Sequence, residues 1–459
     1  MTDFSVRGAN VVVVGAARSG VGAAQLLVAR GARVTLTEQR NKVSLDVRKL
    51  TEVGVELELG GHRTDTLAGA DLIVLSPGVP PVQPTLNAAR ERGVPIISEI
   101  ELASRWVRGR IVAITGTKGK STTTVLLGRM LEMAGCVAFV GGNVGTALST
   151  QIEQSTPEAI HVVEVSSFQL ELTTTFRPWI SVFLNLHTDH LDRHGDAGSY
   201  AAAKARIFAN QEATDTLVVN ADDPEVLRLA RESRATRLDY AVNAPLDDGV
   251  VVSQDAIIRR TGVGFEPLVP LSAVHVLGRH LLSDVVAASA VAHRVGLAPD
   301  DMTSAVDCFP GLEHVLEDVG TVSGVSFIND SKATNVESAR RALESCGGRL
   351  VVLMGGRFKG GRLQALAPEL ASRAEAVVAV GEARDRIRDE FGPIVQVVGA
   401  DSLGEAVQIA YGLAPHGGTV LLSPACSSLD MFQDYAERGR TFKRAVARLR
   451  EEVSGTREQ

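Results

Sequence analysis

The sequence predicts an α/β protein of three domains with mostly parallel sheets. A chain of 459 residues is too long for one ordinary core, so two to four domains are expected. Alanine, valine, glycine and leucine dominate, as in proteins whose parallel strands are buried on both faces. Short apolar runs alternate with helical patterns, and this alternation restarts near residues 105 and 310. We therefore expect domains at residues 1–104, 105–310 and 311–459.

The first domain is expected to be Rossmann-like, because a strand, a glycine turn, a helix and a second strand follow one another at its start. The expected elements are the strand Val11–Val14, the helix Gly22–Arg30, and the strands Arg33–Thr37, Leu72–Leu75 and Ile96–Ile97.

The turn after the first strand suggests one class of function. Gly15-Ala-Ala-Arg-Ser-Gly20 is nearly the dinucleotide-binding pattern G-x-G-x-x-G, and Glu38 ends the second strand about 20 residues further on. A nicotinamide-dependent oxidoreductase is therefore one candidate. Against it, Ala17 stands where the middle glycine lets a pyrophosphate approach the backbone closely.

The central domain opens with the strongest local motif, which predicts a P-loop ATPase type of fold. A strand at Ile111–Ile114 leads into Gly116-Thr-Lys-Gly-Lys-Ser121 and then into a long helix. Glycines let backbone N–H groups approach phosphate oxygens, and the helix N-terminus adds a favourable dipole. Lys120 would reach the terminal phosphates, and the Ser121 hydroxyl would ligate Mg²⁺. The loop is shorter than the common P-loop, because Ile114 stands where that pattern has its first glycine.

The remaining elements continue the α/β alternation. In the central domain we expect strands at Ile160–Val165, Ile180–Leu186 and Thr216–Asn220, an irregular or edge sheet within Asn243–Val269, and a helix at Leu281–Val295. In the C-terminal domain, which we expect to be Rossmann-like, the strands are Gly324–Ile328, Leu350–Met354, Ala376–Val380, Ile394–Val398 and Thr419–Ser423.

Bulk composition excludes several classes. A net charge of −7 provides no general field for a polyanion, and only 4% of the residues are aromatic, so we expect no nucleic-acid partner. The four cysteines form no C-x-x-C pair and are expected to be small buried groups in a reducing compartment. We find no signal-peptide core and no apolar span of about 20 residues, so a cytoplasmic protein without membrane contact is expected.

Five segments together resemble the Mur ligases, and in particular the branch that adds D-glutamate. They are the loop T-G-T-K-G-K-S at 115–121, Glu164–Glu171, Asp189–His194, Asn329–Asn335 and Ser423–Asp430. The loop alone also resembles that of folylpolyglutamate synthetases, but the N-terminal domain and the S-P-A-C-S-S-L-D segment do not. The resemblance spans nearly the whole chain.

The resemblance implies an acid–amino-acid ligase of peptidoglycan precursor synthesis. ATP would phosphorylate the carboxylate of UDP-N-acetylmuramoyl-L-alanine, and the amine of D-glutamate would displace the phosphate, giving ADP and phosphate. Two Mg²⁺ ions and a carbamate on Lys204 are implied, and a monomer is expected. The alternative is a related Mur or folylpolyglutamate-type ligase with another amino acid, such as L-glutamate, or another acceptor.

The resemblance also assigns roles to single residues. Lys120, Glu164, His190 and Lys204 are the implied catalytic residues, and Ser121, Glu164, His190 and carbamylated Lys204 are the implied metal ligands. Without the resemblance, His190 would read as a structural histidine and Lys204 as an exposed helical lysine. The implied ATP-binding residues are Gly116, Thr117, Lys118, Gly119, Lys120, Ser121, Thr122, Thr123, Asp330 and Lys332. The implied substrate-binding residues are Ser19, Gly78, Asn143, Ser166, Thr334, Lys359, Ser428 and Tyr435.

Three positions depart from the usual family pattern. Lys118 replaces an asparagine in the phosphate loop, Leu281 replaces an asparagine near the nucleotide, and Val315 replaces an arginine that approaches ATP. Loss of one polar contact costs about 1 kcal/mol. A non-catalytic nucleotide-binding scaffold is therefore a third candidate class, although Lys120, Glu164, His190 and Lys204 are all present.

Overall fold

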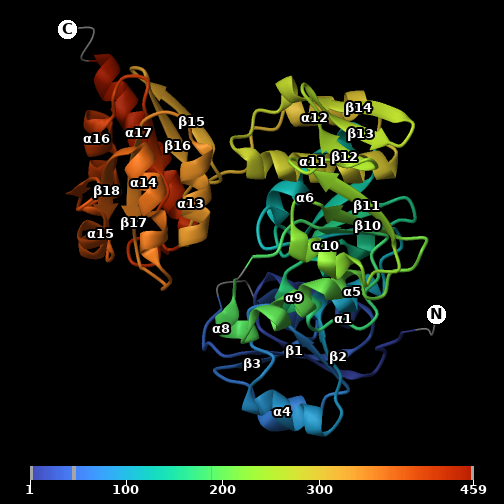
Figure 1. The fold of residues 1–459 in the computed structure, drawn as a ribbon. Helices are drawn as coiled ribbons and strands as arrows, with labels where there is room; N and C mark the ends of the chain where they lie inside the picture. Colours follow the sequence, from blue (N-terminus) through green and yellow to red (C-terminus); the bar gives the residue numbers. More distant parts are fainter. Residues whose placement is uncertain (1–3, 44–47, 188, 456–459) are drawn as a thin grey trace. The chain divides into compact units, whose positions relative to one another are not determined.

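The computed structural model describes residues 4–43, 48–187 and 189–455, which divide into two compact units (Figure 1). The first comprises Met1–Val274 and Ser283–Cys308, and the second comprises His275–Leu282 and Phe309–Gln459. The first unit contains two β-sheets and the second contains one. The domain limits at 104/105 and 310/311 remain a prediction.

The first sheet of unit one is a Rossmann-like parallel sheet with strand order β3-β2-β1-β4-β5. Its strands are β1 Asn10–Val14, β2 Arg33–Glu38, β3 Glu56–Leu59, β4 Leu72–Leu75 and β5 Ile96–Ser98. The helices are α1 Arg18–Ala29, α2 Arg48–Glu52, α3 Thr64–Ala68, α4 Pro84–Glu91 and α5 Glu99–Ser104. Apolar side chains of β1 and β4 are buried against both helical layers, which is why these strands lack a polar face.

The second sheet of unit one has nine strands in the order β14-β13-β12-β11-β10-β9-β6-β8-β7. The strands are β6 Arg110–Thr115, β7 Ala138–Gly142, β8 Ile160–Glu164, β9 Ile180–Phe183, β10 Thr216–Asn220, β11 Thr236–Ala241, β12 Gly249–Val252, β13 Ala256–Thr261 and β14 Gly264–Pro270. Pairing is parallel from β7 to β12, and β13 and β14 add antiparallel strands at one edge. The edge sheet expected within residues 243–269 is thereby confirmed.

Helices and short 3₁₀ turns connect these strands. They are α6 Lys120–Met133, η1 Leu148–Gln154, α7 Ser167–Leu170, α8 Leu191–His194, α9 Ala197–Ala205, η2 Arg206–Phe208, α10 Pro224–Ala230, η3 Leu271–Ala273, α11 Arg279–Val295 and α12 Pro299–Asp307. The apolar α6 residues Leu126, Leu127, Met130 and Leu131 are all buried.

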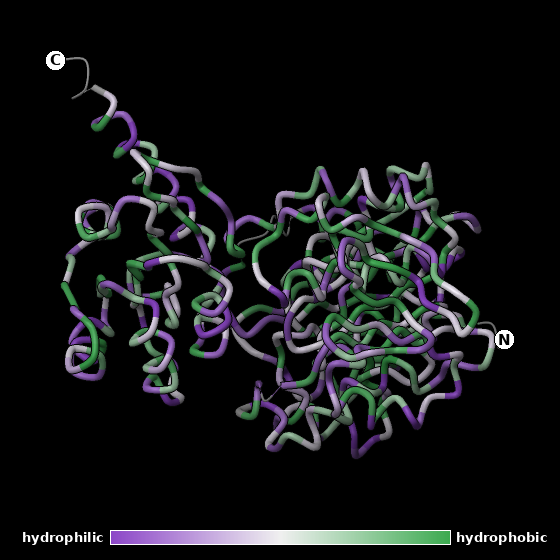
Figure 2. Tube along the Cα trace, turned by 45° about the horizontal axis from the view of Figure 1, so that its top comes forward, coloured by the Kyte–Doolittle hydropathy of each residue, from purple (hydrophilic) through white to green (hydrophobic). Residues whose placement is uncertain are grey.

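Unit two holds a six-stranded sheet of order β15-β16-β20-β17-β18-β19, in which only β15 is antiparallel. Its strands are β15 Glu317–Val322, β16 Val325–Asn329, β17 Leu350–Gly355, β18 Ala374–Val380, β19 Gln396–Gly399 and β20 Thr419–Leu422. Its helical elements are α13 Val336–Ser345, η4 Leu363–Leu366, α14 Ala367–Arg373, α15 Arg384–Phe391, α16 Leu403–Leu413 and α17 Tyr435–Gly455. Buried hydrophobic residues form the core of unit one and the core of unit two (Figure 2).

Several expected boundaries were wrong. Helix α1 begins at Arg18 rather than Gly22. Strand β9 ends at Phe183 rather than Leu186, because the chain after Phe183 turns toward the phosphate loop. Strand β19 begins at Gln396, and Ile394 is exposed. The edge strands β3 and β15, with the patterns E-L-E-L and E-D-V-G-T-V, were missed because edge strands carry charged side chains.

The expectation that every cysteine is a small buried group was wrong for one of them. Cys346 and Cys426 are buried, Cys136 is half-buried, but Cys308 is exposed. All four are free thiols. Burial raises the pKa of Cys346 to about 12 and that of Cys426 to about 11, so neither provides a thiolate near neutral pH.

A fully buried carboxyl group at the start of α5 predicts an unusual pH dependence of stability. One Glu99 oxygen accepts the Ser149 N–H at 2.6 Å, and the other has no hydrogen-bond partner among the described residues. Burial raises the pKa of Glu99 above its ordinary value. The protonated Glu99 carboxyl therefore contributes fully to the free energy of unfolding below the unfolded-state pKa. This contribution is lost as pH rises through the folded-state pKa.

We expect Glu99→Gln to stabilise the chain relative to wild type as pH rises, by roughly 1–3 kcal/mol, since an unpaired buried group costs about that much. Urea unfolding of both chains at pH 5 and pH 8 measures the difference. The difference in the free energy of unfolding between the two chains must be larger at pH 8 than at pH 5. Equal urea midpoints at pH 8 would contradict a raised pKa of Glu99 in the folded state.

Candidate active site

The phosphate loop joins β6 to α6 at the carboxyl end of the parallel strands, where sites of α/β proteins lie. Gly119 caps the helix with φ of 85°, in the left-handed region that favours glycine. A Cβ atom at this position would lie 2.0 Å from Oδ1 of Asp284, a buried residue of α11. Lys120 Nζ donates to the carbonyl oxygens of Gly116 (3.0 Å) and Thr117 (3.1 Å). The lysine ammonium therefore lies over the loop itself.

Glu164, the last residue of β8, lies beside this loop. Its Oε2 accepts the Ser121 hydroxyl at 2.6 Å, and its Oε1 accepts the Asn143 amide at 2.8 Å. The side chain is buried, so the carboxylate has a fixed position. The structure thus brings together a hydroxyl oxygen, a carboxylate and an amide that the sequence analysis had placed in one site.

Lys204 on α9 is not an exposed helical lysine, because it is almost completely buried. Its Nζ donates to Gly116 O at 2.8 Å, the carbonyl that Lys120 also contacts, and lies 4.8 Å from the centre of the Tyr200 ring. Burial, and then the neighbouring Lys120 ammonium, hold the pKa of Lys204 well below its ordinary value. The folded protein therefore favours the neutral form of the Lys204 amine, which is a nucleophile, over the ammonium form.

His190 lies in the loop before α8, in a left-handed conformation with φ of 53°. Its side chain is half exposed, with its ring 5.0 Å from that of Phe168 and Nδ1 4.0 Å from Asp189 Oδ1. In the described part of the chain, no three histidine, cysteine, aspartate or glutamate side chains are grouped to hold a metal ion. The oxygens of Ser121 and Glu164 fit a Mg²⁺ ion only if phosphate and water complete its shell, which is its usual binding mode in proteins.

The Glu38 carboxylate is hydrogen-bonded to the backbone of the glycine turn that follows β1. Glu38 accepts the Ala16 N–H at 2.9 Å and pairs with Arg40, whose hydrogen bond lowers the pKa of Glu38 to about 2. Ser76 Oγ donates to Gly15 O at 3.0 Å, which fixes the loop that contains Gly78. Glu38, which fits the dinucleotide-binding pattern in the sequence, therefore holds the turn in the structure.

Two other implied substrate residues of unit one have different surroundings. Ser19 lies in the first turn of α1, next to Arg18, whose NH1 donates to Gly145 O at 2.7 Å. Ser166 caps α7, and its hydroxyl oxygen accepts the Gln169 N–H at 3.3 Å. Their substrate contacts, and that of Gly78, stay predictions.

In unit two, the implied residues follow three neighbouring strands. Thr334 follows β16, Lys359 follows β17 and Ser428 follows β20, so they gather at one edge of the sheet. Asp330 and Lys332 also follow β16, and Tyr435 starts α17 with its ring 6.3 Å from that of His314. The Asp330 side chain accepts the Leu316 N–H at 3.2 Å. Their roles toward ATP and the amino acid stay predictions.

Sequence reasoning missed a buried arginine beneath these loops. Arg438 donates to Ser331 O (2.8 Å), Ser331 Oγ (3.0 Å) and Cys426 O (3.1 Å), and so ties together the segments that follow β16 and β20. Burial lowers its pKa to about 10. The burial of Arg438 could not be predicted from the sequence, because α17 has mixed polarity and only the fold shows that this side chain points inward.

The two apolar departures from the family pattern serve packing. Leu281 is buried in the core of unit two, and Val315 packs against the same core. His314 and Leu316, on either side of Val315, have φ of 67° and 42°. Leu281 therefore offers no exposed face to a nucleotide base, because its side chain is enclosed by apolar neighbours.

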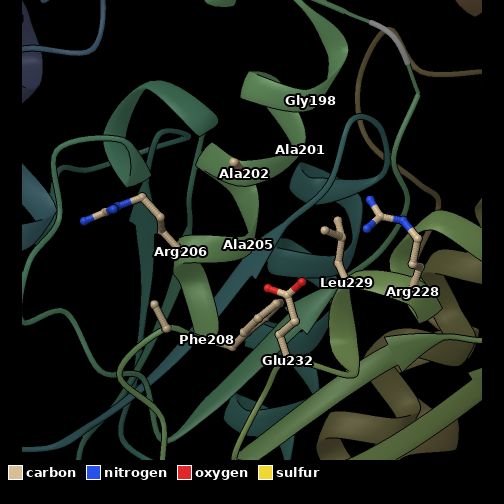
Figure 3. Close-up of a pocket in the computed structure, with 10 residues that line it drawn as sticks. Gly198, Ala201, Ala202, Ala205, Arg206, Phe208, Arg228, Leu229 and Glu232 are labelled. Atoms are coloured by element: carbon tan, nitrogen blue, oxygen red, sulfur yellow. The ribbon is translucent and has the colours of Figure 1, made fainter.

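A separate open depression lies between α9 and α10 (Figure 3). Small residues of α9 line it together with Phe208, Leu229 and Glu232, while the Arg206 side chain points away from it and donates to Leu170 O and Thr173 O. None of the implied catalytic, ATP-binding or substrate-binding residues lines it, so it is no part of the candidate site.

Comparison with known proteins places the whole chain in one family. Residues 9–98 match the MurD-like N-terminal domain of Mur ligases, residues 114–292 the Mur ligase middle domain, and residues 316–426 the Mur ligase glutamate ligase domain. The UDP-N-acetylmuramoylalanine–D-glutamate ligase of Acidobacterium capsulatum is 42% identical over 96% of this chain and 97% of its own length. The enzyme of that name from Desulfosudis oleivorans is 41% identical over 98% and 99%.

Solved structures share the fold. The UDP-N-acetylmuramate–alanine ligase of Thermotoga maritima has a TM-score of 0.61 at 18% identity, over 97% of this chain and all of its own. A pseudomurein peptide ligase of Methanothermus fervidus has the same TM-score at 17% identity, over 96% and 100%. Within the described residues, no helix is long and apolar enough to span a membrane. The three matched domains, the full-length relatives and the phosphate loop facing Glu164 show that this chain belongs to the Mur ligase family of ATP-dependent amide ligases.

Proposed function

We propose that this chain joins D-glutamate to UDP-N-acetylmuramoyl-L-alanine, with ATP converted to ADP and phosphate, in peptidoglycan precursor synthesis. The observation that carries the proposal is the contact of Ser121 and Asn143 with the Glu164 carboxylate beside the phosphate loop. Full-length relatives with this activity in their names support the choice of substrates. Both substrates and ATP are water-soluble, and we propose a monomer that acts in the cytoplasm.

The reaction would proceed in two steps. The substrate carboxylate takes the γ-phosphoryl group of ATP, giving an acyl phosphate and ADP. The amine of the amino acid attacks the acyl carbon, the C–O bond to phosphate breaks, and the amine releases a proton as the amide forms. Such phosphoryl transfer depends on charge neutralisation and positioning rather than on covalent help from the protein.

The roles of the residues in unit one follow from their positions. Lys120, and Lys118 on the same loop, would neutralise phosphate charge when the triphosphate replaces the carbonyl contacts of Lys120. Asn143 fixes the Glu164 carboxylate and would contact the substrate near the reacting group. Ser121 and Glu164 would hold one Mg²⁺, and His190 would lie near the second. These ions would neutralise the developing charge on the phosphoryl oxygens.

Lys204 has the properties that a carbamate needs. A neutral amine adds to CO₂ and releases one proton, which gives an anionic carbamate. Burial and the depressed pKa of Lys204 favour the neutral amine. The carbamate would then attract Lys120 and a second Mg²⁺, where the ammonium form repels both.

In unit two we propose that Asp330 and Lys332 bind the nucleotide, and that Thr334, Lys359, Ser428 and Tyr435 bind the amino acid. These side chains follow adjacent strands of one sheet. Lys359 is exposed and could pair with a carboxylate of the amino acid. We also propose that the domains extend over 1–104, 105–310 and 311–459.

Phosphate release tests this function. With Mg²⁺ and ATP, the purified chain should release phosphate at about 1 s⁻¹ or faster only when both UDP-N-acetylmuramoyl-L-alanine and D-glutamate are present. A panel of D- and L-amino acids, each tested with the same acceptor, serves as the control. Release with L-glutamate but not D-glutamate would move the proposal to the related ligase, and release with no combination would refute it.

A further inference from the structure

We propose that Asn185 is a positioning residue that fastens the phosphate loop to the segment that carries His190. The inference rests on the proposed function, since it assigns the two segments to one site. Asn185 is half-buried and lies two residues past the end of β9, in a stretch that the sequence analysis had taken as strand. It has no role in the chemistry described above.

The side-chain amide of Asn185 contacts the backbone of two successive residues of the phosphate loop, Thr117 and Lys118. Its Oδ1 accepts the N–H groups of Thr117 (3.1 Å) and Lys118 (2.8 Å), and its Nδ2 donates to Lys118 O at 3.0 Å. The backbone carbonyl of Asn185 also accepts the Thr117 N–H, at 3.0 Å. Because a donor and an acceptor are both used, neither a carboxylate nor an apolar side chain could replace the amide.

Four further contacts link residues 117 and 118 to neighbouring segments. Thr117 Oγ1 donates to His187 O at 3.1 Å and accepts the His187 N–H at 2.9 Å. Lys118 Nζ lies 3.5 Å from Asp189 Oδ2, next to His190 in the chain. Thr117 Oγ1 is also within 3.2 Å of the Tyr200 hydroxyl, on the helix that carries Lys204. The phosphate loop, the His190 segment and α9 are therefore linked through residues 117 and 118.

This linkage has a consequence for nucleotide binding. The N–H groups of Thr117 and Lys118 are already used by Asn185, so phosphate oxygens would be met by N–H groups from Gly119 onward, at the start of α6. The loop is held in one shape before the nucleotide arrives, which lowers the ordering cost of binding. Without Asn185 the nucleotide would have to order the loop itself.

The test compares Asn185→Ala with Asn210→Ala. Asn210 is a matched control, because it is also half-buried and its amide also donates to backbone carbonyls, those of Thr174 (2.9 Å) and Phe176 (3.1 Å). We expect Asn185→Ala to raise the KM for ATP about tenfold or more, since two or three hydrogen bonds are lost. The KM for D-glutamate should stay within about twofold of wild type, and Asn210→Ala should change neither constant.

Asn185→Asp tests the donor function of the amide separately from its acceptor function. The carboxylate keeps the acceptor for Thr117 and Lys118 but repels the Lys118 carbonyl oxygen and adds negative charge near the triphosphate. We expect a larger rise in the KM for ATP than with alanine, and calorimetric binding of Mg–ATP should weaken in the same order. Calorimetry also keeps the test valid if Asn185→Ala folds poorly, since the near-isosteric Asp variant can be measured alone.

Three results are decisive. An unchanged affinity for ATP in both Asn185 variants, with normal ligation by wild type, would overturn the inference and leave the proposed function standing. Equal rises in both KM values, shared by Asn210→Ala, would also overturn it, since they would show general destabilisation. Absence of phosphate release by wild type would refute the proposed function, while ATP binding would still test the role of Asn185.

Discussion

Lys204→Ala is expected to lower the rate of ligation roughly a thousandfold, which is the scale of losing one buried electrostatic contact to a reacting phosphoryl group. Lys204 is buried, its Nζ is 2.8 Å from Gly116 O, and its pKa is held well below the ordinary value by burial and by Lys120. Steady-state phosphate release with all three substrates measures the loss, and circular dichroism checks that the fold is intact.

Lys204→Arg is the matched variant for the carbamate. An arginine keeps the positive charge and much of the packing, but its guanidinium group stays protonated and cannot take up CO₂. We expect this variant to be as inactive as Lys204→Ala. Substantial activity in the arginine variant would show that the site needs a cation, and full activity in the alanine variant would refute any catalytic role.

Gly119→Ala is expected to abolish detectable ATP binding. The added Cβ would lie 2.0 Å from Asp284 Oδ1, and the φ of 85° at this position is unfavourable for any residue with a Cβ. Left-handed backbone strain costs about 1–2 kcal/mol, and overpacking adds roughly 1–3 kcal/mol, so the loop would move instead. Calorimetry with Mg–ATP measures the loss of binding, and thermal unfolding measures the cost in stability.

Gly135→Ala distinguishes the effect of left-handed backbone strain from that of a steric clash. Gly135 follows the same helix, α6, at its other end with φ of 72°, but an added Cβ there would meet no atom within 4 Å. This variant should lose about 1 kcal/mol of stability and bind ATP as wild type does. Normal ATP binding by Gly119→Ala, or an equal loss in both variants, would contradict the proposed role of the close contact with Asp284.

Elements with strong patterns could be predicted closely from the sequence. Strands β4 and β10 begin and end where the apolar runs Leu72–Leu75 and Thr216–Asn220 do, because both are buried in parallel sheets. Prediction failed where tertiary contacts compete with periodicity. The apolar stretch after Ile180 leaves the strand at Phe183 because Asn185 pairs with the phosphate loop, which the local sequence does not record.

The sequence by itself determined the family and the reaction chemistry that the family implies, because the phosphate loop and four other segments are local patterns of residue types. Only the tertiary structure decided the state of individual side chains. The sequence alone predicts an exposed helical Lys204, whereas the structure packs α9 beside Gly116. The sequence likewise fits Glu38 to a dinucleotide-binding pattern, whereas the structure shows that it accepts the Ala16 N–H. The reason is physical: burial, pKa and hydrogen-bond partners depend on residues far away in the chain, and a local pattern contains no information about them.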